Sequence, residues 1–202
     1  MVTEWVLASR NAGKAREFDA MLAAYGIRVV PAFVGGGVVV PETGRTYLEN
    51  ATAKARFALE QRGQPALADD SGIEVDALSG APGLYSARYV SDDPWENVEA
   101  VLVKLLEVPW PLRTARMRAV VVLACPGGRL YSAEGVIEGR IGMVPRGTHG
   151  FGYDPIFVGP DGRTLAEWST DEKNAVSHRA QALRQLVAQW RAGAGSRGTA
   201  GQ

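Results

Sequence analysis

The chain has 202 residues, enough for one domain with a sizeable core but few for two independent domains. Its 22 basic and 22 acidic residues give no net charge at pH 7, so no overall field attracts it to nucleic acid or to an anionic membrane. The N-terminal segment lacks the long apolar stretch of a signal peptide, and the longest apolar run, residues 119–125, is too short to cross a bilayer. We therefore expect a soluble, single folding unit that binds neither nucleic acid nor membrane.

The first part of the chain alternates patterns of strands and helices, which predicts an α/β fold. Apolar spacing and glycine positions define the elements. We predict a strand at 5–8, a helix from the turn at 9–14 to Gly26, a strand at 27–31, a glycine-rich loop at 34–44 and a helix at 46–62 that Gly63 ends.

The second part begins with a helix that Asp93 caps and that presents one apolar face through residue 106. Residues 115–125 and 129–141 flank a Pro-Gly-Gly turn and predict an antiparallel hairpin, which makes the sheet mixed. A last helix follows the capping-box residues Ser169 and Glu172. We assign residues 1–191 to one domain and expect residues 192–202 to be disordered.

Cys125 is the only cysteine, so the chain can form no internal disulfide. A protein without disulfides suits a reducing compartment, and we expect a cytoplasmic location. Because Cys125 ends an apolar run, we interpret it as a small core residue and not as a reactive thiol.

The turn after the first strand has the outline of an anion site. It consists of Ser9, Arg10, Asn11, Ala12, Gly13 and Lys14. Backbone N–H groups and the positive end of a helix point outward at such a turn. Its spacing is not that of a P-loop, and turns with Asn and Gly are common for structural reasons alone, so both interpretations stay open.

Asp69 and Asp70 lie side by side in an apolar segment, although a buried carboxylate without a partner is costly. Side chains alternate along a strand, so the two carboxylates should face opposite sides. We expect the strand to break at Ser71 and Gly72, which leaves Asp70 facing a cleft and Asp69 serving loop structure. Glu42 adds a further acid on a glycine-rich loop, and such carboxylates suit Mg2+. An ordinary turn is the alternative explanation of Asp-Asp-Ser-Gly.

Phe151 and Tyr153 stand between glycines on a loop, where they could stack on a planar base or anchor the loop to the core. On the last helix Asn174, Ser177 and His178 fall on the side opposite the apolar stripe. Lys173 lies one turn before Ser177, and Arg179 follows His178, so a Lys, a His and an Arg come together near the start of the helix. They could hold a polyanion or form an ordinary solvated face. We expect no zinc site, because no cysteine or third histidine accompanies His178.

Five segments, in this order, resemble the inosine triphosphate pyrophosphatase family. They are LASRNAGKAREF, ETGRTYLENA, ADDSGIEVDALSGAPGLYSARY, PRGTHGFGYDPIF and EKNAVSHRAQAL, and they extend over nearly the whole chain. The resemblance implies hydrolysis of non-standard purine nucleoside triphosphates such as ITP, dITP and XTP to the monophosphate and pyrophosphate. It also implies Mg2+ dependence, a homodimer, and an α/β fold with an elongated mixed sheet flanked by helices and two lobes around a nucleotide cleft.

The resemblance also implies roles for individual residues. Asp70 would be the proton acceptor and a metal ligand, and Glu42 a second metal-site acid. The expected substrate-binding residues are Ser9, Arg10, Asn11, Ala12, Gly13, Lys14, Ser71, Phe151, Gly152, Tyr153, Asp154, Lys173, His178 and Arg179. Two positions depart from the family pattern: Arg10 and His149 stand where the family often has glycine.

Two other classes of protein compete with the enzyme. A nucleotide-binding module without turnover would keep the basic and aromatic residues but would not need Glu42 and Asp70 near a metal. A nucleic-acid-binding protein is disfavoured by the zero net charge and the lack of a Lys/Arg cluster. The expected mechanism is attack of water assisted by Mg2+ and a carboxylate, with Lys14 and Lys173 neutralising the triphosphate.

Overall fold

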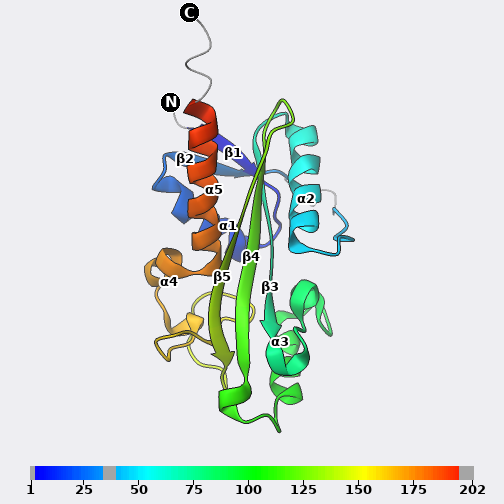
Figure 1. The fold of residues 1–202 in the computed structure, drawn as a ribbon, viewed down its shortest axis with the longest axis vertical. Coiled ribbons are helices and arrows are strands. Elements are labelled where there is room, and N and C mark those ends of the chain that lie inside the picture. Colours follow the sequence, from blue (N-terminus) through cyan, green and yellow to red (C-terminus); the bar gives the residue numbers. More distant parts are fainter. Residues whose placement is uncertain (1–2, 34–39, 196–202) are drawn as a thin grey trace, which may run out of the picture. The chain divides into compact units, whose positions relative to one another are not determined.

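A computed structural model describes residues 3–33 and 40–195, and it contains a six-stranded sheet with the strand order β2-β1-β3-β4-β5-β6 (Figure 1). The strands are β1 (Thr3–Leu7), β2 (Ile27–Pro31), β3 (Ala66–Val75), β4 (Thr114–Ala124), β5 (Leu130–Ile141) and β6 (Phe157–Val158). β1 pairs in parallel with β2 and β3, whereas β5 and β6 are antiparallel. The sheet is therefore mixed, which confirms the predicted α/β class.

Five α-helices are described. They are α1 (Ala12–Ala23), α2 (Tyr47–Arg62), α3 (Pro94–Lys104), α4 (Thr170–Val176) and α5 (His178–Gly195). Short 3-10 helices cover Asp76–Leu78, Gly83–Arg88, Trp110–Leu112 and Leu165–Glu167. The first four helices are each capped at the start by a side chain that accepts a backbone N–H of the first turn. These N-cap residues are Asn11, Thr46, Asp93 and Ser169. Gly63 ends α2 in the left-handed conformation, as predicted.

The chain divides into two compact units. Unit 1 comprises residues 1–70, 120–135 and 179–202, and unit 2 comprises residues 71–119 and 136–178. Each unit has its own hydrophobic core. In the sequence, β3, β4 and β5 each contribute residues to both units.

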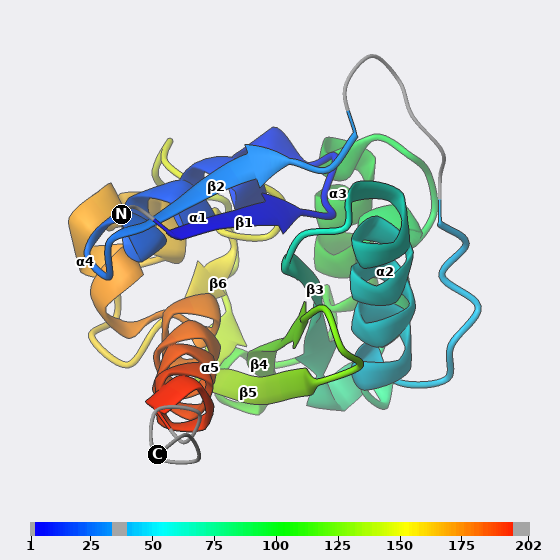
Figure 2. The ribbon, with the colours of Figure 1, turned by 90° about the horizontal axis from the view of Figure 1, so that it is seen from above.

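The core of unit 1 forms where β1, α1 and α5 pack together. Figure 2 shows β1 and β2 next to each other, with α1 along them. Trp5 and Phe18 are fully buried in this core, and the Trp5 ring meets the Trp190 ring edge to face with centroids 5.1 Å apart. Cys125 is buried in the same core, as predicted.

The core of unit 2 encloses an arginine. Arg113 is 1% exposed, and its guanidinium donates to the carbonyls of Leu105 at 2.6 Å, Val108 at 2.9 Å and Gly142 at 3.2 Å. Three carbonyl partners satisfy a buried cation that would otherwise be costly. Arg113 thus holds the segment after α3 against the residue that follows β5.

Three predictions about elements are wrong. β3 continues through Ser71 and Gly72, because Ile73 and Val75 alternate into the core of unit 2. The last helix is two helices, since Ser177 adopts an extended conformation with ψ 163°. Helix α5 also continues through Gly195, so residues 192–195, which we predicted to be disordered, are helical. The rest of the predicted tail, residues 196–202, lies outside the described residues.

Two smaller differences concern exposure and the glycine-rich loop. The apolar face predicted to run through residue 106 includes Trp95 at the start of α3 and Leu106 just after its end, and both are exposed. Of the predicted loop at 34–44, residues 34–39 lie outside the described residues. Over the two described ranges, no helix is long and apolar enough to cross a membrane.

Candidate active site

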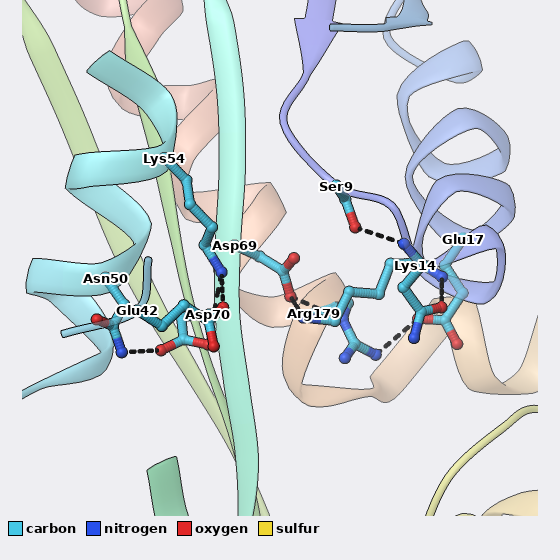
Figure 3. A network of polar contacts seen from close by, with 10 residues as sticks. Ser9, Lys14, Glu17, Glu42, Asn50, Lys54, Asp69, Asp70 and Arg179 are labelled. Atoms are coloured by element: carbon cyan, nitrogen blue, oxygen red, sulfur yellow. Dashed lines mark hydrogen bonds and ion pairs between the residues drawn. The ribbon is translucent and has the colours of Figure 1, made fainter. Parts of the chain in front are cut away.

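Asp69 and Asp70 point to opposite sides of β3, as the alternation of side chains along a strand predicts (Figure 3). Both are buried, at 1% and 5% exposure. Each carboxylate therefore needs partners on its own side of the strand, and both sets of partners belong to unit 1.

Asp69 holds two cations from different helices (Figure 3). Lys14 Nζ of α1 lies 2.8 Å from Asp69 Oδ2, and Arg179 Nε of α5 donates to the same oxygen at 3.3 Å. Arg179 Nη1 also donates to Glu17 Oε2 at 2.8 Å. Among the described residues, the buried Oδ1 of Asp69 has no hydrogen-bond partner. The predicted role of Asp69 in loop structure is thus corrected: it positions two cations.

The protonation of this group is fixed by its neighbours. Burial opposes the charge of Asp69, but Lys14, Arg179 and Lys54 outweigh burial and hold the pKa of Asp69 well below its usual range. Burial lowers the pKa of Lys14, and the charge of Asp69 counteracts that shift. Asp69 is therefore an anion at neutral pH and a poor proton acceptor.

Asp70 faces α2 on the other side of the strand (Figure 3). Asn50 Nδ2 donates to Asp70 Oδ2 at 2.9 Å, and Lys54 Nζ lies 3.6 Å from Asp70 Oδ1. The same ammonium donates to Glu42 Oε1 at 2.7 Å. Asn50 and Lys54 are four residues apart, so they share one face of α2.

A close backbone contact holds the Glu42 segment against α2. Gly44 N–H donates to Asn50 Oδ1 at 2.8 Å. A Cβ at position 44 would lie 2.7 Å from that oxygen, so glycine is required there. One carboxamide thus fixes both Asp70 and the loop that carries Glu42.

The environment of Asp70 shifts its pKa in the opposite direction from that of Asp69. Burial raises the pKa of Asp70, and Lys54 and Asn50 only partly oppose the shift. For Lys54, burial favours the neutral amine, but Asp69, Asp70 and Glu42 together outweigh it and raise the pKa of Lys54. Asp70 is the carboxylate suited to accept a proton, and Lys54 remains charged beside it.

Glu42 and Asp70 also fit a small metal site, because both present hard oxygen donors to one cation, the Lys54 ammonium. Within residues 3–33 and 40–195, no group of three or more His, Cys, Asp or Glu side chains is placed to hold a metal. Two protein carboxylates suffice for Mg2+ when substrate phosphates and water complete its coordination.

The predicted anion turn uses its own side chains to cap α1. Ser9 Oγ accepts the N–H of Asn11 at 3.2 Å, and Asn11 Oδ1 accepts the N–H of Lys14 at 3.0 Å. Ala12 and Gly13 open the helix. Arg10 is exposed. The turn therefore has a defined conformation, and Lys14 is the member that lies beside Asp69.

In unit 2 the aromatic loop is wrapped around Asp154. This buried carboxylate accepts the N–H of Phe151 at 2.8 Å and is ion-paired with Lys173, which is itself buried. Lys173 Nζ lies 4.9 Å from the centre of the Phe151 ring. Gly150 has φ +75°, and a Cβ there would lie 2.0 Å from Asp154 Oδ2, so the loop needs glycine at this point.

The two aromatic residues of this loop differ in exposure. Tyr153 lies in the core of unit 2 and donates from its hydroxyl to the carbonyl of Ser86 at 2.8 Å, and burial raises its pKa. Gly152 next to it has φ +59°. Tyr153 thus anchors the loop, while Phe151 is half-buried and remains the candidate to stack on a base.

The predicted residues at the start of α5 are buried. His178 and Arg179 are 2% and 4% exposed, so the interpretation of this face as ordinary solvated surface is wrong. Ser71 is half-buried in β3, and His149 is exposed.

Sequence reasoning missed three residues of unit 1: Glu17, Asn50 and Lys54. The spacing of Asn50 and Lys54 in ENATAK was an available signal, because residues four apart share a helix face. Glu17 carries no such signal, because Arg179 is its partner and lies 162 residues away in the sequence.

Comparison with known proteins gives consistent matches. A sequence model of the Ham1 family matches residues 5–189. The dITP/XTP pyrophosphatase of Symbiobacterium thermophilum is 51% identical over 178 residues, which cover 88% of this chain and 90% of that protein. The structure of a HAM1 protein from Coxiella burnetii matches with a TM-score of 0.80 and 42% identity over 94% of this chain and 98% of that chain. The Staphylococcus aureus Ham1 protein matches with a TM-score of 0.81 and 35% identity over 94% and 99% of the two chains.

Proposed function

Because the chain belongs to the Ham1 family, we propose that it hydrolyses non-standard purine nucleoside triphosphates, such as ITP, dITP and XTP, to the nucleoside monophosphate and pyrophosphate. The observation that carries this proposal is the environment of Asp70, a buried carboxylate between Asn50 and Lys54 whose pKa burial raises. Asp69, the residue before it, is instead ion-paired with Lys14 and Arg179, which hold its pKa low. A nucleotide-binding module without turnover would have no use for that difference.

The residues of unit 1 would act on the triphosphate. Asp70 takes the proton of the attacking water, and its raised pKa favours that transfer. Lys14 and Lys54 supply positive charge for the phosphate oxygens and for the leaving pyrophosphate. Asp69 keeps Lys14 in place for this task.

Glu42 and Asp70 would hold Mg2+, whose chemistry is to neutralise and orient phosphate oxygens. The donor set supports this assignment, since both carboxylates already share a cationic partner. In unit 2, Phe151 would stack on the base, while Asp154 and Lys173 fix the loop that presents the ring.

The test is product analysis with ITP, XTP, dITP and ATP in the presence of Mg2+. We expect equal amounts of monophosphate and pyrophosphate from the first three and much slower cleavage of ATP. Release of orthophosphate would contradict the reaction. Tight binding of ITP without any product would favour the binding module.

Dimerisation is part of the same proposal. Val103, Leu106, Leu112, Met143 and Val144 in unit 2 are each more than half exposed. The buried guanidinium of Arg113 ties the segment after α3 to the segment after β5, and these segments carry most of the five residues. Exposed apolar side chains of this kind suit a subunit interface. Light scattering after gel filtration should give a dimer for the wild type and a monomer for Leu106→Glu; a monomeric wild type would contradict the proposal.

We also propose a cytoplasmic location. The substrate class is a cellular nucleotide pool, and the single buried Cys125 forms no internal disulfide, which suits a reducing compartment.

A further inference from the structure

Lysine is rare in this chain, and its placement is selective. The sequence has 4 lysines against 18 arginines. Three of the four lysines are ion-paired with carboxylates of the candidate site: Lys14 with Asp69, Lys54 with Glu42 and Asp70, and Lys173 with Asp154. An ammonium is a compact charge on a flexible stem, whereas a guanidinium is a planar fork that favours fixed two-point contacts. Lysine is thus the cation that can change partners most readily.

Lys54 differs from the other two because it contacts both acids of the candidate metal site. Its ammonium lies 2.7 Å from Glu42 Oε1 and 3.6 Å from Asp70 Oδ1. The Lys54 side chain is 13% exposed, and Asn50 holds Asp70 from the other oxygen. Two negative charges and one positive charge leave this group with a net charge of −1.

We propose that Lys54 is a resident counter-cation of the metal site, and that a Mg2+-nucleotide complex displaces it from Glu42 and Asp70. This inference rests on the proposed function, since it takes the two acids as the metal ligands. An ammonium and a metal ion cannot share the same carboxylate oxygens without strong repulsion. The triphosphate adds negative charge, so it gives the displaced ammonium a new partner in the same step.

Two consequences follow for binding. Without nucleotide, Mg2+ must compete with Lys54 and binds weakly. With nucleotide, the metal takes the carboxylates and Lys54 moves to the phosphates, so the metal and the nucleotide bind with positive coupling. The enzyme would then avoid holding Mg2+ in an empty site.

The first test is calorimetric titration of Mg2+ into nucleotide-free protein. We expect Lys54→Met to bind Mg2+ at least about ten-fold more tightly than the wild type, because the competing positive charge is gone. Lys104→Met is the matched control: Lys104 is exposed on α3 of unit 2, over the Tyr89 ring, and its removal should leave the Mg2+ affinity unchanged. Equal or weaker binding by Lys54→Met would overturn the proposal.

A second test uses the wild type, so it holds even if Lys54→Met does not fold. With 13C-labelled lysine the four Cε signals are few enough to follow individually by NMR, and Lys54→Arg assigns one of them. The Lys54 signal should stay in place when Mg2+ alone is added. It should move when the same Mg2+ concentration is added with inosine 5′-(α,β-imido)triphosphate. No movement with the complex, or equal movement with Mg2+ alone, would overturn the proposal.

The displacement of Lys54 and the proposed reaction can fail independently of each other. Pyrophosphate release from ITP combined with unchanged Mg2+ binding in Lys54→Met would refute the displacement of Lys54 alone. Tighter Mg2+ binding in Lys54→Met without any hydrolysis of ITP by the wild type would refute the proposed reaction alone.

Discussion

The two units secure their candidate site residues by different means. Unit 1 uses charge: four carboxylates and three cations lie on the two sides of β3. Unit 2 uses one buried ion pair, Lys173 and Asp154, to support an aromatic ring. Dense, opposed charge suits a polyanion and a metal ion, whereas a supported ring suits a planar, uncharged base. Changes in unit 1 should therefore affect chemistry or folding, and changes in unit 2 should affect substrate binding.

A second contrast lies within unit 1, between adjacent residues. Asp69 is surrounded by cations that hold its pKa low, while burial raises the pKa of Asp70. Two aspartates therefore differ in role: Asp69 is a structural anion on one side of β3, and Asp70 is a candidate base on the other side.

The largest effect should come from Asp69→Asn. It leaves the buried Arg179 and the partly exposed Lys14 without their shared anion, and breaking a buried ion pair in this way costs about 3 kcal/mol of unfolding free energy. Urea denaturation measures the loss. The control is Asp19→Asn on the exposed side of α1, where we expect a change within about 0.5 kcal/mol. Wild-type stability of Asp69→Asn would show that the two cations do not depend on this carboxylate.

Asp70→Asn should have the next largest effect, and on rate instead of folding. We expect kcat for ITP to fall roughly 100-fold or more with KM little changed, because the proton acceptor and a metal ligand are lost. Its unfolding free energy should stay the same or rise, since burial already disfavours the charged form. Near-normal kcat in Asp70→Asn, together with a folded but inactive Asp69→Asn, would reverse the assignment of the pair.

Phe151→Ala should act mainly on binding. Loss of a stacking surface costs on the order of 1–3 kcal/mol, so KM for ITP should rise roughly 10-fold or more while kcat changes little. Phe151→Tyr keeps the ring and should restore most of the affinity. A collapse of kcat at unchanged KM would mean that the ring supports catalytic groups instead of holding the base.

The smallest effect concerns Glu172 at the start of α4. A hydrogen bond from Arg163 and the N–H of Ser169 lower the pKa of this carboxyl to about 2. Its contribution to stability is complete above the ordinary pKa of 4.5 and is lost as the pH falls towards 2. Carboxyl NMR of Arg163→Gln should show the Glu172 titration moved back towards 4.5; an unchanged midpoint would assign the shift to the helix cap alone.

Local signals in the sequence were enough for most of the elements. Thr46 and Gly63 bracket α2, and Asp93 with Pro94 opens α3, because caps act on backbone groups only a few residues away. The opposite orientation of Asp69 and Asp70 follows from strand geometry alone, and it was predicted for the same reason.

Contacts between distant residues could not be predicted in this way. That Asp69 binds Lys14 and Arg179 depends on the packing of α1 and α5, which lie far from β3 in the sequence. The burial of Lys173 depends on Asp154, on a loop before α4. Lys54 faces Glu42 only because Gly44 brings its segment against Asn50. Pattern and spacing describe one element at a time. They therefore indicate which residues belong to a site better than they indicate which of those residues contact each other.

The edge-to-face pair of Trp5 and Trp190 joins the first strand to the last helix of unit 1, and this gives the protein an optical reporter. Trp5 is fully buried on β1, so its emission should be blue-shifted, and the neighbouring indole makes that emission sensitive to the docking of α5. Trp190→Phe keeps a ring at this contact but leaves Trp5 as the single indole there. Trp95, Trp110 and Trp168 also emit, so all three must be replaced by Phe as well. The emission of Trp5 would then shift to the red when the C-terminal helix detaches and water reaches the ring, separately from the unfolding of the rest of the chain.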